Sequence, residues 1–173
     1  MKEKTISLGH GGGGLLSREL IDQEIVTRFG KGPLQGLPDG ARLPSFSGDV
    51  IFSTDSFVVN PIMFSGGNIG HLAVHGTVND LAVSGGEPKY LSLALILEEG
   101  FKLSVLRTIL DSIKEAADEC GVVIATGDTK VVAIGQCDGI YINTAGIGQA
   151  ISGFQLGPEK IQQGDVVITS GNL

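Results

Sequence analysis

The stretch YLSLALILEEGFKLSVLRTILDSIKEAADECGVVIATGDTKVV, Tyr90–Val132, decides the fold, because it holds a strand, a helix and a second strand in succession. Its first part, Tyr90–Glu98, is almost wholly apolar, which predicts a strand covered on both faces. Apolar residues recur at helical spacing from Ser104 to Cys120, and Gly121 supplies a stop signal. The valine- and isoleucine-rich residues 122–134 predict the second strand, interrupted by GDTK.

Similar patterns predict the elements on either side of this stretch. We expect a helix over Ser17–Phe29 with Ser17 as its N-cap, followed by a long glycine- and proline-rich loop, Lys31–Gly48. The other expected elements are a strand over Asp49–Val59, a small-residue helix over Gly67–Ser84, a strand over Gly139–Gln149 and a further strand beginning at Val166.

Strands that alternate with amphipathic helices predict an α/β or α+β sandwich, with a mixed sheet and helices on one face. The chain is 173 residues long, which is about one domain. We expect residues 1–16 to be a flexible glycine-rich arm and residues 17–165 to be the folded domain. Residues 166–173 would begin a linker or the first strand of a second domain.

Composition excludes several classes of function. The formal net charge of −7 opposes binding to nucleic acid. No run of about 18 apolar residues is present and no secretory signal opens the chain, so the sequence indicates a cytoplasmic protein. The two cysteines, Cys120 and Cys137, lack the spacing of a zinc site or a redox pair.

The segment GHGGGG fits a dinucleotide-binding pattern through Gly9, Gly11 and Gly14. The helix after it leads into the long loop and not into a parallel strand, which disfavours a dinucleotide-binding fold. Two interpretations stay open: a backbone arm that closes over phosphate oxygens, and a merely flexible terminus.

Three aspartates, Asp55, Asp80 and Asp128, interrupt apolar segments, where an unpaired charge is costly. Carboxylates suit Mg²⁺, which fills the rest of its shell with water and nucleotide phosphates. Separate structural roles for the three are the alternative. His71 and His75 stand four residues apart without the glutamate of a zinc motif, so we interpret them as polar helix residues.

GDTK differs from a P-loop in residue order and lies between strand-forming residues. Its residue types still suit phosphate. Gly127 permits close approach, Asp128 can hold a metal, and Lys130 supplies a positive charge.

Long motifs connect these features to a known family. The succession GHGGGG, FSTDSFVVNP, FSGGNIGHLAVHGTVNDLAVSGGEPKYLSLALILEEG, ATGDTKVV, DGIYINTAGIG and GDVVITSG resembles the N-terminal domain of the HypE family, the carbamoyl dehydratases of [NiFe] hydrogenase maturation. The glycine arm, the strand aspartate, the Asn-Asp pair and the Gly-Asp-Thr segment also resemble the wider aminoimidazole ribonucleotide synthetase superfamily.

The resemblance implies a domain that uses ATP and Mg²⁺ and dimerises by joining its sheets across a two-fold axis. It implies that Lys130 is the catalytic, phosphate-binding lysine. The implied metal ligands are Asp55, Asp80 and Asp128, and the implied ATP-binding residues are Gly11, Gly12, Gly13, Gly14, Asn79, Gly127, Thr129 and Lys130.

The family's reaction dehydrates an S-carbamoyl cysteine at the C-terminus to a thiocyanate, and the resemblance implies the carbamoyltransferase HypF and the HypC–HypD scaffold complex as partners. Family members continue past the position of Leu173 with a second α/β domain and the acceptor cysteine, so we expect this chain to lack that cysteine. The alternatives are a non-catalytic dimerisation or docking module, and selenophosphate or thiamine-phosphate chemistry. The latter is disfavoured because no reactive N-terminal cysteine is present and the motifs fit the HypE family better.

Overall fold

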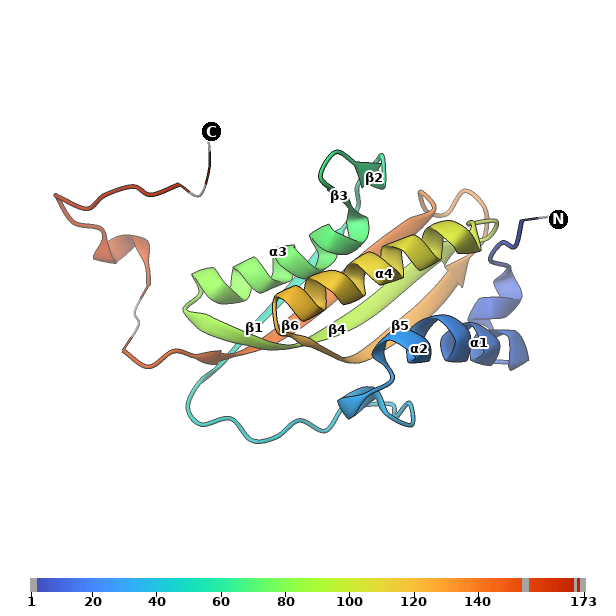
Figure 1. Cartoon of the computed structure of the whole chain (residues 1–173), viewed down its shortest axis with the longest axis horizontal. Helices are drawn as coiled ribbons and strands as arrows, with labels where there is room; N and C mark the ends of the chain where they lie inside the picture. The colour runs from blue at the N-terminus through green and yellow to red at the C-terminus, as the bar shows by residue number, and fades with distance from the viewer. Residues whose placement is uncertain (1–2, 154–155, 170, 172–173) are drawn as a thin grey trace.

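The computed structural model describes residues 3–153, 156–169 and 171, and its centre is one four-stranded sheet (Figure 1). The strands are β1 (Val50–Phe57), β4 (Gly86–Glu98), β5 (Val123–Val132) and β6 (Ile140–Ala150). Their order is β1-β6-β4-β5. β6 pairs antiparallel with both β1 and β4, whereas β5 runs parallel to β4, so the sheet is mixed as predicted.

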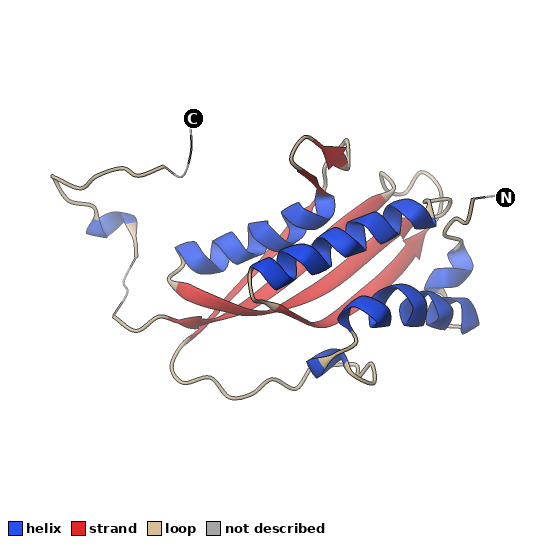
Figure 2. Cartoon of the chain, in the orientation of Figure 1, coloured by secondary structure: helices blue, strands red, loops and turns tan. Residues whose placement is uncertain are grey.

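Two long helices, α3 (Ile69–Val83) and α4 (Leu103–Glu119), lie side by side over one face of this sheet (Figure 1, Figure 2). They confirm the prediction of a mixed sheet with helices on one face. The short strands β2 (Met63–Phe64) and β3 (Gly67–Asn68) form a hairpin that leads into α3. In the described part of the chain, no helix has the length and apolar character needed to cross a membrane.

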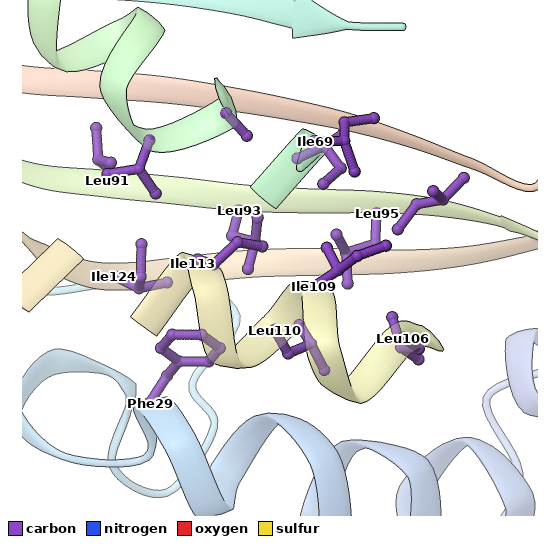
Figure 3. Close-up of a cluster of buried hydrophobic side chains, with 14 of the residues drawn as sticks. Phe29, Ile69, Leu91, Leu93, Leu95, Leu106, Ile109, Leu110, Ile113 and Ile124 are labelled. Atoms are coloured by element: carbon purple, nitrogen blue, oxygen red, sulfur yellow. The ribbon is translucent and has the colours of Figure 1, made fainter. Parts of the chain in front are cut away.

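The core lies between the sheet and the helices (Figure 3). Alternate β4 residues, Leu91, Leu93, Leu95 and Leu97, are buried beneath α3 and α4. On the other face of β4, Tyr90 is half-buried and Ile96 is 40% exposed. The prediction that this strand is covered on both faces was therefore wrong for the single chain, because α3 and α4 cover only one side.

The N-terminal helix differs from its prediction. It begins at Leu15 and has three parts, α1 (Leu15–Leu20), the π-helix η2 (Ile21–Val26) and α2 (Thr27–Phe29). Gly14, and not Ser17, is the N-cap. The Ser17 hydroxyl instead accepts a hydrogen bond from the N–H of Gly13 at 2.9 Å and donates to the carbonyl of Gly9 at 3.3 Å, so it ties the glycine arm to the helix.

The arm itself contains the 3₁₀ helix η1 (Leu8–Gly11), and Thr5 forms a single antiparallel bridge with Lys102. Two further short 3₁₀ helices are η3 (Gly32–Leu34) and η4 (Pro158–Lys160). The strand expected from Val166 does not form over 166–169, where Val166, Val167 and Ile168 are 82–91% exposed. A strand needs a neighbour to accept its backbone hydrogen bonds, and none lies beside this segment among the described residues.

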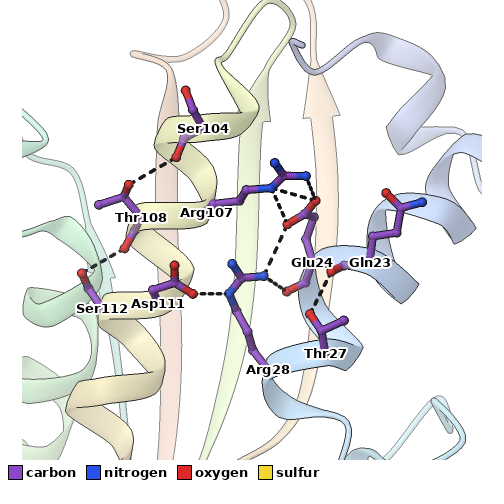
Figure 4. A network of polar contacts seen from close by, with 9 residues as sticks. All are labelled: Gln23, Glu24, Thr27, Arg28, Ser104, Arg107, Thr108, Asp111 and Ser112. Carbon is purple, nitrogen blue, oxygen red and sulfur yellow. Dashed lines mark hydrogen bonds and ion pairs between the residues drawn. The ribbon is translucent and has the colours of Figure 1, made fainter. Parts of the chain in front are cut away.

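An ion network centred on the buried Glu24 connects the N-terminal helix to α4 (Figure 4). The Glu24 side chain is 4% exposed and binds Arg107 in a bidentate manner, at 2.7 Å to Nη2 and 3.0 Å to Nε. Arg28 donates to the same carboxylate at 3.3 Å and to Asp111 of α4 at 2.6 Å. The hydrogen bond from Arg107 is the largest cause of a lowered pKa at Glu24, and it outweighs the effect of burial.

We expect Glu24→Gln to lower the free energy of unfolding by about 2 kcal/mol at neutral pH, because charge-assisted hydrogen bonds are lost. Since folding lowers the pKa of Glu24, its contribution is complete above the ordinary value of 4.5 and is lost as pH falls through the folded pKa. Denaturant unfolding should therefore show the difference between the two proteins shrinking below pH 4.5.

The matched control is Asp22→Asn, which removes the exposed ion pair between Arg18 and Asp22 on the same helix. Exposed pairs contribute little, so we expect a loss below about 0.5 kcal/mol. Equal losses for the two variants would contradict a special role for Glu24.

Candidate functional site

GDTK lies within β5 and does not interrupt it, so the predicted break in this strand was wrong. Leu93, Ala94, Leu95 and Ile96 of β4 pair in register with Gly127, Asp128, Thr129 and Lys130. Paired residues share a face of the sheet, so Thr129 lies on the side of α3 and α4 while Asp128 and Lys130 lie on the opposite side. β5 is an edge strand, which leaves its other edge open to further contacts.

A cavity of about 540 Å³ lies along this free edge, within the size range of small-molecule sites. Four segments of the chain form its walls. The glycine arm contributes His10, Gly11 and Gly13; β4 contributes Leu93 and Leu95; β5 contributes Ile124 and Thr126 to Lys130; the N-terminal helix and the loop after it contribute Ser17, Ile21, Ile25, Leu34, Leu37, Pro38 and Asp39. The lining thus combines apolar side chains with hydroxyl and charged residues.

Close backbone contacts at two glycines bring these walls together. A side chain at Gly11 would place its Cβ 2.8 Å from both the backbone nitrogen and the Cβ of Val131, so the arm lies directly on β5. A side chain at Gly127 would collide with the carbonyl oxygen of Leu93 in the neighbouring strand. Glycine at both positions therefore permits close packing of backbone, and at Gly127 the close neighbour is β4, whereas the sequence predicted close approach to phosphate.

Several residues that line this cavity were not predicted as site residues. His10 lies within GHGGGG and Asp39 within the long loop 31–48, and neither was proposed as a ligand-binding residue. The hydroxyl of Ser17 and the apolar side chains of Ile21 and Ile25 complete the wall. The position of His10 next to a run of glycines was the signal in the sequence that could have identified it as a site residue.

The other predicted metal ligands lie elsewhere. Asp55 is on β1. It pairs with Thr144 of β6, which pairs with Leu93 of β4, which in turn pairs with Gly127 of β5. The strands β1 and β5 are therefore three strand spacings, or about 14 Å, apart. Asp80 is on α3, where its carboxylate accepts from the hydroxyl of Ser53 at 3.0 Å. Asn79 precedes it on the exposed side of the same helix. One copy of the chain therefore does not bring Asp55 and Asp80 to Asp128.

Asp55, Asp80 and Asp128 are all exposed, so the argument that burial must be compensated at these positions was wrong. Asp55 and Asp128 lie on the two edge strands, and Asp80 lies on the outer side of α3, where water solvates a carboxylate. No group of three or more histidine, cysteine, aspartate or glutamate side chains gathers within the described ranges. His71 and His75 instead make local contacts, at 3.3 Å to the N–H of Asn68 and 3.4 Å to the sulfur of Cys120.

The thiols lie away from the cavity. Burial is the main cause that raises the pKa of both Cys120 and Cys137, with the nearby carboxylates Glu119 and Glu98 adding to it. Both thiols are therefore poor nucleophiles.

Comparison with known proteins places the domain in a family. The family model for AIR synthase related protein, N-terminal domain, matches residues 39–150. The chain belongs to this family. The matched range includes β1, α3, β4, α4, β5 and β6, so it covers the whole sheet and the GDTK edge, while the glycine arm precedes it.

The AIR synthase related domain is also similar to individual proteins. It is 45% identical over 173 residues to carbamoyl dehydratase HypE of Bradyrhizobium diazoefficiens, covering 100% of this chain and 50% of that protein. A crystal structure of hydrogenase maturation protein HypE in complex with ATP is 48% identical, with a TM-score of 0.82 over 85% of this chain and 44% of that one. A crystal structure of a HypE–HypF complex contains a chain that is 46% identical. Its TM-score is 0.61, and the match covers 78% of this chain and 43% of that one.

The chain thus spans about half the length of the curated relatives it matches. The similarity to HypE covers the arm, the cavity and the sheet together, because it extends over almost the whole of this chain.

Neighbouring glycines of the arm provide a test of how it is held. We expect Gly11→Ala to lift the arm from β5, because the new methyl group would meet backbone and side-chain atoms of Val131 at 2.8 Å. Gly12→Ala is the matched control, since its nearest atom would be the carbonyl oxygen of Gly9 at 3.7 Å. Hydrogen exchange should show faster exchange over residues 10–13 in the first variant alone; unchanged exchange in both would contradict the contact.

Proposed function

We propose that this chain is the Mg-ATP-binding domain of a HypE-type carbamoyl dehydratase. The observation that carries the proposal is the cavity at the β5 edge, which gathers the glycine arm and GDTK around one space of nucleotide size. A HypE structure in complex with ATP, 48% identical to this chain, shares the fold, which supports the nature of the ligand.

The polar groups of the cavity suit a triphosphate. Lys130 offers a positive charge and Thr129 a hydroxyl. The apolar side chains of Ile21 and Ile25 add the character that a nucleobase needs.

The residues of the cavity suit Mg²⁺ that is bound together with a nucleotide. They suit an isolated metal ion less well. Asp128 is a carboxylate at the cavity, and Mg²⁺ in nucleotide sites takes one or two carboxylates and completes its shell with phosphates and water. Bound Mg²⁺ would neutralise charge on the transferring phosphoryl group. Asp128 would hold it, while Lys130 would contact the phosphate oxygens from the same strand.

Asp55, Asp80 and Asn79 would act from a second copy of the chain. The sheet face opposite α3 and α4 is apolar and partly uncovered: Phe52 is 65% exposed and Tyr90 and Ile147 are half-buried. Two copies that join these faces in a homodimer would bury them and would add new groups to the edge of each sheet. The three aspartates share one metal only in such an assembly.

In the proposed reaction, ATP phosphorylates the oxygen of a carbamoyl group on a cysteine sulfur. The nitrogen loses one proton as the O-phosphorylated imidate forms and its second proton as phosphate leaves with the carbamoyl oxygen, so that a thiocyanate remains. Neither Cys120 nor Cys137 suits the acceptor, because both thiols are at least partly buried and have a raised pKa. We assign the acceptor to the part of the relatives that this chain does not span.

The proposed partners are a HypF carbamoyltransferase, which would load the carbamoyl group, and a HypC–HypD scaffold, which would receive cyanide in the cytoplasm. A HypE–HypF complex with 46% identity to this chain supports the first.

We expect Lys130→Ala to weaken Mg-ATP binding at least tenfold, because a charge that faces the phosphates is lost. Isothermal titration calorimetry measures this directly. Lys114→Ala, an exposed change on α4 away from the cavity, is the control and should leave the affinity unchanged. If the Lys130 variant and the unaltered protein bind Mg-ATP with equal affinity, the proposal that GDTK binds the phosphates is wrong.

Mixing two variants tests the shared site. We expect Asp55→Asn and Asp128→Asn each to abolish tight Mg-ATP binding. Their equimolar mixture, after subunit exchange, should recover roughly a quarter of the wild-type sites, since each hybrid dimer keeps one site with both aspartates. No recovery in a mixture shown to exchange subunits would mean that each copy holds its metal alone.

A further inference from the structure

We infer that His10 is a phosphate-binding residue of the cavity, one that donates a hydrogen bond from its Nε2 to an oxygen of the β- or γ-phosphate of the nucleotide. The inference rests on the proposed function and adds a side chain to a site for which only the glycine backbone, GDTK, Asn79 and aspartates were predicted.

The ring of His10 is oriented by its other nitrogen. The backbone N–H of Ser7 donates to Nδ1 at 2.9 Å, the Ser7 hydroxyl lies at the same distance from that atom, and the Ser7 carbonyl oxygen lies 3.2 Å from it. We assign Nδ1 as the acceptor, because the backbone N–H can only donate and makes the shorter contact. A neutral imidazole that accepts at Nδ1 carries its proton on Nε2, so Nε2 is then a hydrogen-bond donor. Among the described residues, no hydrogen bond or ion pair to Nε2 is formed, and this donor is left for a ligand.

The position of the ring relative to the phosphate-binding groups is fixed by the arm. His10 lines the same cavity as Gly13 and Lys130. The next residue, Gly11, lies against Val131, which follows Lys130 on β5. His10 and Lys130 are therefore each adjacent in sequence to the contact between the arm and β5.

The surrounding charges favour an anion at this place. The charged groups that line the cavity with His10 are Lys130 and Asp128 on β5 and Asp39 in the loop. Bound Mg²⁺ would offset Asp128, so His10 and Lys130 would remain as side-chain donors facing the phosphates. Two donors from different segments of the chain can each bind an oxygen of a flexible phosphate chain.

A purely structural role for His10 has to be separated from this one, because its Nδ1 also caps η1 by accepting from Ser7. Substitution of His10 by asparagine or by glutamine separates the role of Nδ1 in the cap from the role of Nε2 in ligand binding. Asparagine places an acceptor near the position of Nδ1 and has nothing at Nε2, whereas glutamine places an N–H donor near the position of Nε2 and gives up the cap.

The experiment compares His10→Asn, His10→Gln and the unaltered protein by isothermal titration with Mg-ATP, Mg-ADP and AMP, together with thermal unfolding of each protein. We expect His10→Asn to unfold like the unaltered protein yet bind Mg-ATP about 10- to 100-fold more weakly, because a hydrogen bond to a charged group is lost. His10→Gln should retain most of the affinity, and AMP should bind all three proteins with similar affinity.

Three results would overturn the inference. The first is an unchanged Mg-ATP affinity in His10→Asn. The second is a loss in His10→Gln alone that follows a lower unfolding temperature, which would assign His10 to the cap. The third is an equal loss for AMP and ATP, which would mean that the ring shapes the cavity. Absence of Mg-ATP binding by the unaltered protein would instead overturn the proposed function, and the inference with it.

Discussion

The parallel pairing of β5 with β4 is the constraint on which the rest of this domain depends. It places Gly127, Asp128, Thr129 and Lys130 on an edge strand, in register with apolar residues of β4. An edge strand keeps one side free, and the glycine arm and the N-terminal helix occupy that side to enclose a cavity. A central strand would have used the same backbone groups for pairing and left no room for a ligand.

The network around Glu24 connects this site to the core. The π-helical turn that contains Glu24 also presents Ile21 and Ile25 to the cavity, while the ion pair of Glu24 with Arg107 holds the turn to α4. π-helical turns are frequently found at functional sites, where the wider turn shifts side chains relative to an α-helix. Here the turn directs a carboxylate towards α4 and apolar side chains towards the cavity.

The chain carries two sets of residues with different locations. The arm and GDTK gather at the β5 edge, whereas Asp55, Asp80 and Asn79 lie around β1 and α3 at the opposite edge. The uncovered apolar face between them, with Phe52 and Tyr90, provides a surface on which a second copy would unite the two sets. Dimerisation and nucleotide binding would then be linked, because a site completed by two chains favours their association.

The sequence by itself determined the elements that depend on local physics. Helical spacing in 104–120, the apolar run of β4 and the glycine stops predicted the order of helices and strands, and the residue types of GDTK indicated phosphate. Only the tertiary structure decided which groups meet. It joined His10 and Asp39 to GDTK, separated Asp55 and Asp80 from Asp128, exposed all three aspartates and left Val166–Thr169 unpaired. Spacing along a chain specifies a face or a turn, whereas strand order, register and edge position arise from pairings between residues far apart in sequence.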